Sequence, residues 1–368
     1  MGLVGRGLCY TQGLILYLAP SSGRLILMAA RITRTLFRSI VMRNLLQTIT
    51  MIFAFTIAGC VEGSGTEHGN VSIDVSPDGK TVVFSSADGD LFLFNIKSKS
   101  VKRLTSTDAI ESVPAFAPDG KSIVYSASKD SSSAGSIYHM VLAGLATTKL
   151  TSEDEQSDFL PRYSPDEKKI IFGRAYRNRP YSMGGTIWDD WDVCEMDADG
   201  KNVTRLTTEN YYQLYRMVPR TDGSIVYSAG TNAVAYTITV GDRKIEQIPL
   251  DSDAETKPNA WASDIMISPD ESTMVFTSDR TRAFWYDVCL STDGNKATGL
   301  VGKKSRYNRY PDFAPDGERI IFMARTKFGN GNRPIFSLWE VSTTGNSREI
   351  ASDQLFTDPA SYKPKNAE

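Results

Sequence analysis

A short turn built on Pro-Asp-Gly recurs along the chain, and it restricts the possible folds more than any other feature. Copies stand at Ser76–Gly79, Ala117–Gly120, Ser164–Glu167, Ser268–Glu271 and Ala314–Gly317, with a degenerate copy at Pro219–Gly223. Proline presets φ at the second turn position, aspartate accepts hydrogen bonds from the following backbone, and glycine accepts a positive φ. An apolar run ending in an aromatic residue follows each turn, for example Val82–Phe84. Each copy therefore predicts a β-hairpin.

The spacing of the copies predicts a repeat architecture. The six turn prolines lie 41 to 54 residues apart, a period that is typical of propellers with one four-stranded blade per copy. We therefore expect an all-β fold, a six-bladed β-propeller of four-stranded antiparallel blades, preceded by a signal peptide and a short tether. The propeller should occupy residues 71–352. Residues 353–368 contain proline and lysine and are expected to form a frayed C-terminal tail.

The third copy carries a resemblance to a known family. Its segment Trp191–Gly200 is followed by Thr204-Arg205-Leu206-Thr207. A strand that runs into an Asp-Gly turn and then into an Arg-Leu-Thr strand resembles the repeat of the TolB-like (WD-like) β-propellers. The resemblance covers about Val71–Ser352 and implies the propeller fold. It does not name a ligand, because the repeat residues build the blades.

The amino-terminal segment has the features of an export signal. Residues 1–61 contain six arginines and no acidic residue, and Leu45–Gly59 is an apolar run of 15 residues. This length is short for a membrane span and suits the core of a signal peptide. The sequence Ile57-Ala58-Gly59-Cys60 resembles the lipobox of bacterial lipoproteins, which implies cleavage before Cys60 and lipidation of its thiol. We expect a signal peptide over 1–59 and a lipidated tether over 60–70, with an uncleaved signal anchor as the alternative.

Two further expectations concern this segment. Met42 is followed by one basic residue and then the apolar core, so it (or Met28) makes a more compact start, and residues 1–41 would then be a mis-annotated extension. Val61 follows Cys60 where an aspartate would retain an enterobacterial lipoprotein in the inner membrane. This resemblance favours the outer membrane over the inner membrane.

Composition narrows the function. From residue 60 onward the chain has 35 basic and 43 acidic residues, and an acidic body argues against nucleic-acid binding. The whole chain contains two histidines, too few for the histidine-rich metal site of oligogalacturonate-lyase-like propellers. We find no Gly-x-Ser-x-Gly elbow. We therefore expect no catalytic residue, no metal and no cofactor.

Candidate ligand-binding residues lie where we expect loops on one rim of the propeller. The segment Arg174–Asp190 is predicted as a long loop of the third copy, and equivalent loops follow in the fifth and sixth copies. Tryptophan, tyrosine and arginine dominate binding hot spots, and guanidinium groups suit carboxylates. The alternative is that these loops pack on each other and cap the channel. The candidates are Arg174, Tyr176, Arg177, Arg179, Tyr181, Trp188, Arg280, Arg282, Trp285, Arg325 and Arg333.

A second candidate set lies on the first strand of each copy, which should line the central channel. Three residues before the turn proline stand Asp74, Arg162, Arg216 and Asp312. The acids belong to the first and sixth copies and the arginines to the third and fourth. The channel is therefore predicted to be acidic on one side and basic on the other. The alternative is a buried network of structural ion pairs.

These observations together favour a monomeric, non-catalytic lipoprotein on the periplasmic face of a bacterial envelope. Its propeller rim would bind an envelope protein or peptide, with an anionic glycan as a further ligand class. One alternative is a carbohydrate-active enzyme, a polysaccharide lyase or hydrolase. Another is an accessory propeller subunit of a separately encoded hydrolase. Fold alone does not decide among them.

Overall fold

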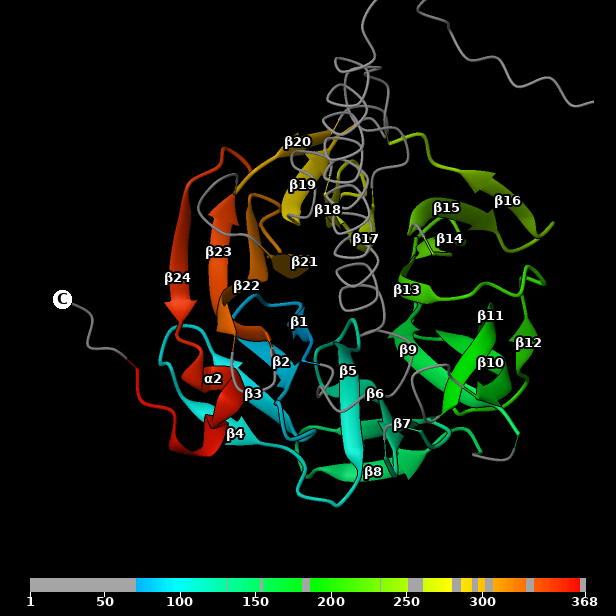
Figure 1. Ribbon diagram of the computed structural model, residues 1–368, viewed down its shortest axis with the longest axis horizontal. Helices are drawn as coiled ribbons and strands as arrows, with labels where there is room; N and C mark the ends of the chain where they lie inside the picture. Colours follow the sequence, from blue (N-terminus) through cyan, green and yellow to red (C-terminus); the bar gives the residue numbers. More distant parts are fainter. Residues whose placement is uncertain are drawn as a thin grey trace, which may run out of the picture. The chain divides into compact units, whose positions relative to one another are not determined.

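The computed structural model describes residues 71–364 except 131, 153–154, 181–185, 232, 251–260, 280–285, 293–296, 302–306 and 329–333. Within these residues, 24 strands form six antiparallel sheets of four, each built from consecutive strands. The sheets are arranged around a central axis, from the first sheet in blue to the last in red (Figure 1). The first strands of successive sheets contact one another, and β21 contacts β1. The predicted six-bladed propeller is confirmed.

The strand bounds follow the repeat. Blade 1 contains β1 (Ile73–Val75), β2 (Thr81–Ser85), β3 (Leu91–Asn95) and β4 (Val101–Arg103). Blade 2 contains β5 (Ile110–Phe116), β6 (Ser122–Ser128), β7 (Ser136–Val141) and β8 (Ala146–Lys149). Blade 3 contains β9 (Ser157–Tyr163), β10 (Lys169–Pro180), β11 (Thr186–Asp197) and β12 (Thr204–Arg205).

The second half of the ring is built in the same way. Blade 4 contains β13 (Leu214–Pro219), β14 (Ser224–Ala229), β15 (Val234–Thr239) and β16 (Lys244–Gln247). Blade 5 contains β17 (Ser263–Ile267), β18 (Met274–Ser278), β19 (Asp287–Ser291) and β20 (Ala297–Gly299). Blade 6 contains β21 (Asn308–Phe313), β22 (Arg319–Phe328), β23 (Pro334–Ser342) and β24 (Ser347–Ala351), and it is followed by α2 (Gln354–Thr357) and the short helix η3 (Pro359–Ser361).

The repeated turn acts both within a hairpin and between blades. In blade 1, Asp78 Oδ1 accepts from Ser76 Oγ at 2.7 Å and from the Lys80 amide at 3.0 Å. Gly79 has φ +67°, and a Cβ added to it would lie 2.7 Å from Cδ of Pro315, the turn proline of blade 6. The glycine is therefore required by the turn and by the neighbouring blade together.

The degenerate fourth copy is shifted from its predicted position. The Gly223 amide donates to the Arg220 carbonyl at 3.1 Å, the hydrogen bond that closes the other turns. Thr221 therefore takes the place of the turn proline, and Pro219 is the last residue of β13. Glu271 of blade 5 stands where other copies have glycine, and its Oε1 accepts from the Thr221 amide at 2.7 Å. This contact joins the two turns where proline packing is missing.

The Arg-Leu-Thr signature joins the fourth strand to the third. In blade 3, Arg205 pairs with Asp192, and Thr207 Oγ1 donates to Asp192 Oδ1 at 2.6 Å. The Val193 amide donates to Thr207 Oγ1 at 3.0 Å, and Leu206 is buried between the two polar residues. The same contacts recur in blade 1 with Asp90, Leu91, Arg103 and Thr105. The signature is therefore structural.

Hydrophobic cores lie between neighbouring blades. Among the described residues, six buried clusters are found, and each is shared chiefly by two consecutive blades. Val83 of blade 1 and Ile123 of blade 2, for example, are fully buried in one cluster. The cluster between blades 6 and 1 contains Ile73, Phe84 and Leu338. The ring is therefore closed by the same kind of packing that joins every other pair of blades.

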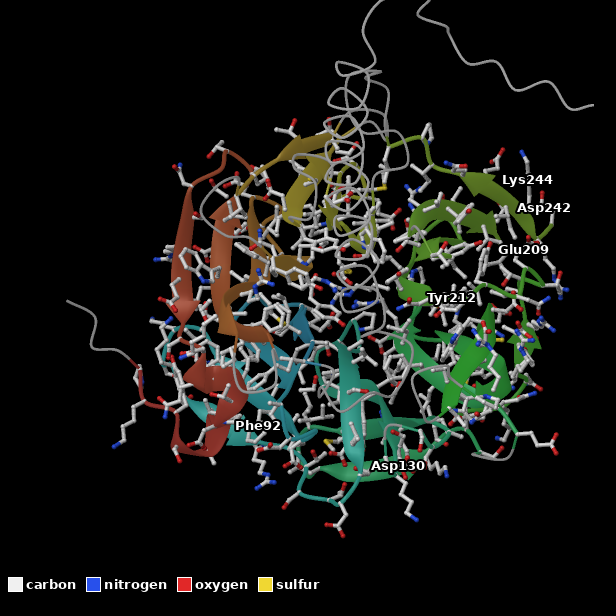
Figure 2. All side chains as sticks on the ribbon, in the orientation of Figure 1. Phe92, Asp130, Glu209, Tyr212, Asp242 and Lys244 are labelled. Atoms are coloured by element: carbon white, nitrogen blue, oxygen red, sulfur yellow. The ribbon has the colours of Figure 1, made fainter. Side chains whose placement is uncertain are left out.

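The C-terminal segment also closes the ring, so the predicted frayed tail is wrong over residues 353–364. Leu355 and Phe356 of α2 are buried, and the Phe356 ring lies edge-on to Phe84 of blade 1 at 5.3 Å. The Ala87 amide donates to the Phe356 carbonyl at 3.0 Å. Phe92, which belongs to the same cluster, is labelled in Figure 2. Since β24 pairs within blade 6, this apolar contact takes the place of a strand shared between the ends of the ring.

Candidate functional site

The third-blade segment predicted as a loop consists of paired strands on either side of 181–185, which lie outside the described residues. Strands β10 and β11 stay paired from Lys169↔Asp197 to Pro180↔Thr186. Arg177 Nε lies 3.0 Å from Asp190 Oδ2, and its Nη2 lies 3.1 Å from Asp189 Oδ2. Arg179 pairs with the same Asp189 carboxylate. Opposite charges on facing strands stabilise the pairing, so these residues extend the blade instead of forming an irregular loop.

Several predicted ligand residues of these strands contact the protein itself. Arg174 holds the fully buried Asp158 through two hydrogen bonds, at 2.7 and 2.8 Å. The Arg205 guanidinium lies 4.1 Å from the centre of the Tyr176 ring. Trp188 packs against the core between blades 3 and 4. Arg177, with 53% of its side chain exposed, is the more accessible candidate.

The remaining rim candidates separate into two groups. Tyr181, Arg280, Arg282, Trp285 and Arg333 lie outside the described residues, as does the predicted lipidation site Cys60. Arg325 on β22 lies over the Tyr307 ring, 5.0 Å from its centre. Tyr307 belongs to a run of aromatic rings with neighbouring centroids 4.8 to 6.2 Å apart, formed by Trp261, Tyr286, Tyr307 and Phe336.

The four predicted channel residues come together in one cluster. Arg162 Nη2 lies 2.6 Å from Asp74 Oδ1, and Arg216 Nη2 lies 3.1 Å from the same oxygen and 3.5 Å from Asp312 Oδ2. The acids and arginines therefore meet in mutual ion pairs, and the expected separation into an acidic and a basic side is wrong. The arginine side chains of blades 3 and 4 are long enough to reach across the channel to the carboxylates of blades 1 and 6.

The carboxylates of this cluster also hold the neighbouring blades. Asp74 Oδ2 of blade 1 accepts from the Phe116 amide of blade 2 at 2.8 Å. Asp312 Oδ2 of blade 6 accepts from the Val75 amide of blade 1 at 2.9 Å, which joins the two ends of the ring. Burial raises the pKa of Asp312 above its ordinary value, while Arg216 opposes the shift. Both acids therefore have a structural role.

The first strands carry backbone strain where they line the channel. Val113, Leu160 and Tyr310 have φ values of 45°, 58° and 51°, a region that is unfavourable for bulky side chains. Each lies at a register shift of its strand and precedes a proline, although residues before proline prefer extended backbone. Such strain costs on the order of 1–3 kcal/mol per residue and concentrates at functional sites. Sequence reasoning missed these residues, although a proline four residues before the turn proline in three copies was a usable signal.

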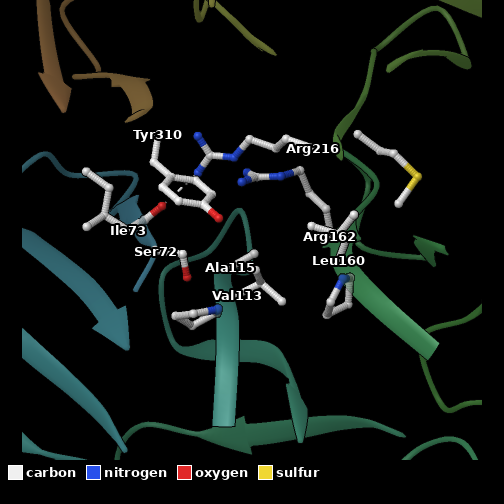
Figure 3. A pocket seen from close by; sticks show the side chains of 11 residues that line it. Ser72, Ile73, Val113, Ala115, Leu160, Arg162, Arg216 and Tyr310 are labelled. Carbon is white, nitrogen blue, oxygen red and sulfur yellow. Dashed lines mark hydrogen bonds between the residues drawn. The ribbon is translucent and has the colours of Figure 1, made fainter. Parts of the chain in front are cut away.

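The strained residues and the arginines line one pocket, shown in Figure 3. Its walls include Ser72, Val113, Leu160, Arg162, Arg216 and Tyr310, which come from the innermost segments of five blades. The pocket is small, with room for one or two water molecules. We call it the channel pocket. It combines positive charge, apolar walls and a rigid backbone.

Two features are absent from the part of the chain that the structure describes. No group of three or more histidine, cysteine, aspartate or glutamate side chains there is placed to hold a metal ion. No helix in the same residues is long and apolar enough to cross a membrane.

Comparison with known proteins adds three similarities. The model of the TolB beta propeller domain family matches residues 60–185. Dipeptidyl-peptidase 5 of Porphyromonas gingivalis is 26% identical over 275 residues, which are 69% of this chain and 37% of that protein. The Tol-Pal system protein TolB of Francisella tularensis subsp. holarctica is 34% identical over 227 residues, which are 48% of each chain. The chain thus spans about half, or less, of the length of these curated relatives.

Solved structures share the fold. The crystal structure of TolB from Acinetobacter baumannii superimposes with a TM-score of 0.54 at 18% identity, covering 76% of this chain and 62% of that one. At this identity the likeness concerns the fold alone. The match of residues 60–185 to the TolB beta propeller domain family, together with the closed ring of four-stranded blades, confirms the expected resemblance of this chain to the TolB-like β-propellers.

Proposed function

We propose that this propeller is a non-catalytic binding module that captures a protein or peptide partner in the periplasm. The channel pocket carries the proposal, because two arginines and three strained backbone positions converge on a single opening. Similarity to a Tol-Pal system protein supports a role in the bacterial envelope. The partner would contact the pocket and the rim where the first strands begin, which we call the entry rim and which includes Arg177 and the exposed Tyr212.

The state of the acidic residues favours binding over acid–base chemistry. Asp189 and Asp190 on β11 are engaged by Arg177, and Asp192 is fully buried against Arg205 and Thr207. A carboxylate whose oxygens are already engaged by ion pairs and hydrogen bonds within the protein is poorly placed to exchange a proton with a substrate. We therefore assign these residues to the scaffold.

The lipid anchor is part of the same proposal. Acylation at Cys60 would attach the propeller to the periplasmic face of the envelope, with the outer membrane favoured. Two or three acyl chains give stable anchoring because each buried CH₂ contributes about 0.8 kcal/mol. The tether of residues 60–70 would leave the propeller free to reach its partner.

A second candidate function is that of an accessory propeller that works beside a separately encoded hydrolase. The observation that favours it is the match to a dipeptidyl-peptidase, which covers 69% of this chain but only 37% of that protein. In that case the captured partner would itself be an enzyme.

A cross-linked pull-down of the full-length protein from solubilised envelopes, read by mass spectrometry, tests the proposal. Wild type would be compared with a variant on the entry rim, Arg177→Ala/Tyr212→Ala. The control is Arg348→Ala/Val203→Ala, at an exposed position of β24 and at the exposed residue that precedes β12. We expect one stoichiometric protein partner that is lost in the rim variant and retained in the control. A hydrolase as that partner would favour the accessory role. Absence of a specific partner from every sample would refute the binding module.

A further inference from the structure

We propose that the channel pocket binds a carboxylate group of the partner, with Arg162 as the docking donor. This inference rests on the proposed function for the identity of the partner, but the chemistry of the site can be tested without it. The shared ligand chemistry is a single carboxylate, supplied either by a peptide C-terminus or by an aspartate or glutamate side chain.

The two arginines of the pocket differ in how fully they are used. Arg216 is buried, and its guanidinium donates to the Pro311 carbonyl at 3.0 Å, to the Ile73 carbonyl at 2.8 Å and to Asp74. Arg162 donates through Nη2 to Asp74, and no other hydrogen bond from its guanidinium is found among the described residues. A guanidinium presents five N–H donors. Arg162 therefore has spare donors at the wall of the pocket, while Arg216 is a second positive charge in the same wall that is already bonded to the protein.

The acids of the cluster leave these donors available. Asp74 Oδ1 accepts from both arginines and its Oδ2 accepts from the Phe116 amide. Asp312 Oδ2 accepts from the Val75 amide. Both carboxylates are thus committed to the protein framework. Because burial raises the pKa of Asp312, the negative charge that would repel an incoming anion is also reduced.

The size and walls of the pocket select the kind of anion. Val113 and Leu160 form apolar walls, which strengthen a charge-assisted hydrogen bond by excluding water. The small free volume accepts the head of a carboxylate and leaves the rest of the ligand in the channel. A singly charged group is also better matched than a dianion, because Asp74 already balances one of the two arginines. The strained backbone fixes the opening before the ligand arrives.

Ligand-observed NMR with acetate tests the site on the full-length protein in detergent micelles. We expect saturable binding in the millimolar range, weakened roughly tenfold to a hundredfold by Arg162→Gln, because a hydrogen bond to a charged group contributes about 1.5–3 kcal/mol. Arg162→Lys keeps the positive charge but loses the two parallel N–H donors of the guanidinium, so its acetate affinity should lie between those of wild type and Arg162→Gln. Arg348→Gln, on an exposed and distant arginine, is the matched control and should bind like wild type.

The outcomes separate folding from binding. If Arg162→Gln loses its native circular dichroism, the double variant Asp74→Asn/Arg162→Gln is measured instead, because it also removes the charge of the carboxylate that has lost one of its two arginine partners. Equal acetate affinity in wild type and in the folded Arg162 variant overturns the proposal. So does the absence of saturable acetate binding, and so does inorganic phosphate that binds as tightly as acetate.

Short peptides then identify the source of the carboxylate. N-acetyl-Gly-Ala-Val with a free C-terminus, its C-terminal amide, and N-acetyl-Gly-Glu-Ala amide present the group in turn. Binding of the first alone assigns a C-terminus, and binding of the third assigns an acidic side chain. A pull-down with Arg162→Gln keeps the two proposals distinct. A partner captured without any carboxylate binding defeats this inference alone, whereas carboxylate binding without a partner defeats the proposed function alone.

Discussion

Replacement of Phe356 with alanine tests whether the C-terminal segment closes the ring. Phe356 is 2% exposed, its ring lies 5.3 Å from that of Phe84, and its carbonyl accepts from the Ala87 amide at 3.0 Å. The segment belongs to the chain of blade 6 but packs on blade 1. If this contact closes the ring, its loss lowers the free energy of unfolding of the whole propeller.

The size of the effect has an upper limit. Truncation of a buried phenylalanine costs about 3–5 kcal/mol where the surroundings cannot relax. A short segment can detach instead, and then the cost cannot exceed the free energy with which it docks. Burial of Leu355 and Phe356 contributes about 1.5–3 kcal/mol each, and the ordering of the backbone offsets part of this gain. We therefore expect a loss of about 2–4 kcal/mol.

Urea denaturation followed by tryptophan fluorescence measures the loss. Thr357→Ala is the control, because Thr357 is exposed on the same helix, and its change should stay within about 0.5 kcal/mol. A variant that ends at Ser352 should be destabilised at least as much as Phe356→Ala. A loss below about 1 kcal/mol for Phe356→Ala would refute ring closure by this segment. A greater loss for Phe356→Ala than for the truncation would show that the substitution disturbs blade 1 itself.

Three further predictions follow from single contacts. Glu167 has φ +60° at a turn position where other copies have glycine, so Glu167→Gly should raise the free energy of unfolding by about 1 kcal/mol. In the same urea titration Glu271→Gly should raise this free energy by less, because it also loses the 2.7 Å contact to the Thr221 amide. Arg205→Ala leaves the buried Asp192 carboxylate without its ion pair and should lower the free energy of unfolding by about 3 kcal/mol, measured by calorimetry. A loss below that of an ordinary surface substitution would contradict the structural role of the Arg-Leu-Thr signature. Burial raises the folded-state pKa of Asp312, so the carboxyl of the unfolded chain loses its proton at a lower pH than that of the folded chain. The free energy of unfolding therefore falls as pH rises above about 4. Asp312→Asn should flatten this decline in thermal melts, and an unchanged slope would show that another group causes it.

The fold was predictable because its information is local and repeated. Turn chemistry at Ser76–Gly79 and its copies fixes one hairpin per blade, and five regular copies compensate for the degenerate fourth. That copy was placed correctly, but Pro219 was predicted as the turn proline, whereas the hydrogen bond from the Gly223 amide to the Arg220 carbonyl puts Thr221 at this position. Asp74, Arg162 and Asp312 were identified from their position before the turn, and Arg216 was counted from Pro219. The pairing of the four was not predicted.

Other features depend on contacts that sequence patterns do not record. The segment Arg174–Asp190 lacks apolar alternation, and its strands are held instead by cross-strand ion pairs with Asp189. Leu355 and Phe356 form too short an apolar pair to indicate a docking partner. The positive φ of Val113 and Leu160 contradicts local preference and exists only because the surrounding ring enforces it.

The position of this strain would join stability and the proposed binding in the same residues. Positive φ at Val113 and Leu160 costs free energy, and the domain can tolerate it only if neighbouring contacts offset it. The clamp from Asp74 to the Phe116 amide supplies such a contact on the same strand as Val113. Asp74 in turn needs a cation, and Arg162 provides one with only part of its donor set. The network that holds the channel in its strained shape therefore also presents the N–H groups to which a carboxylate would bind.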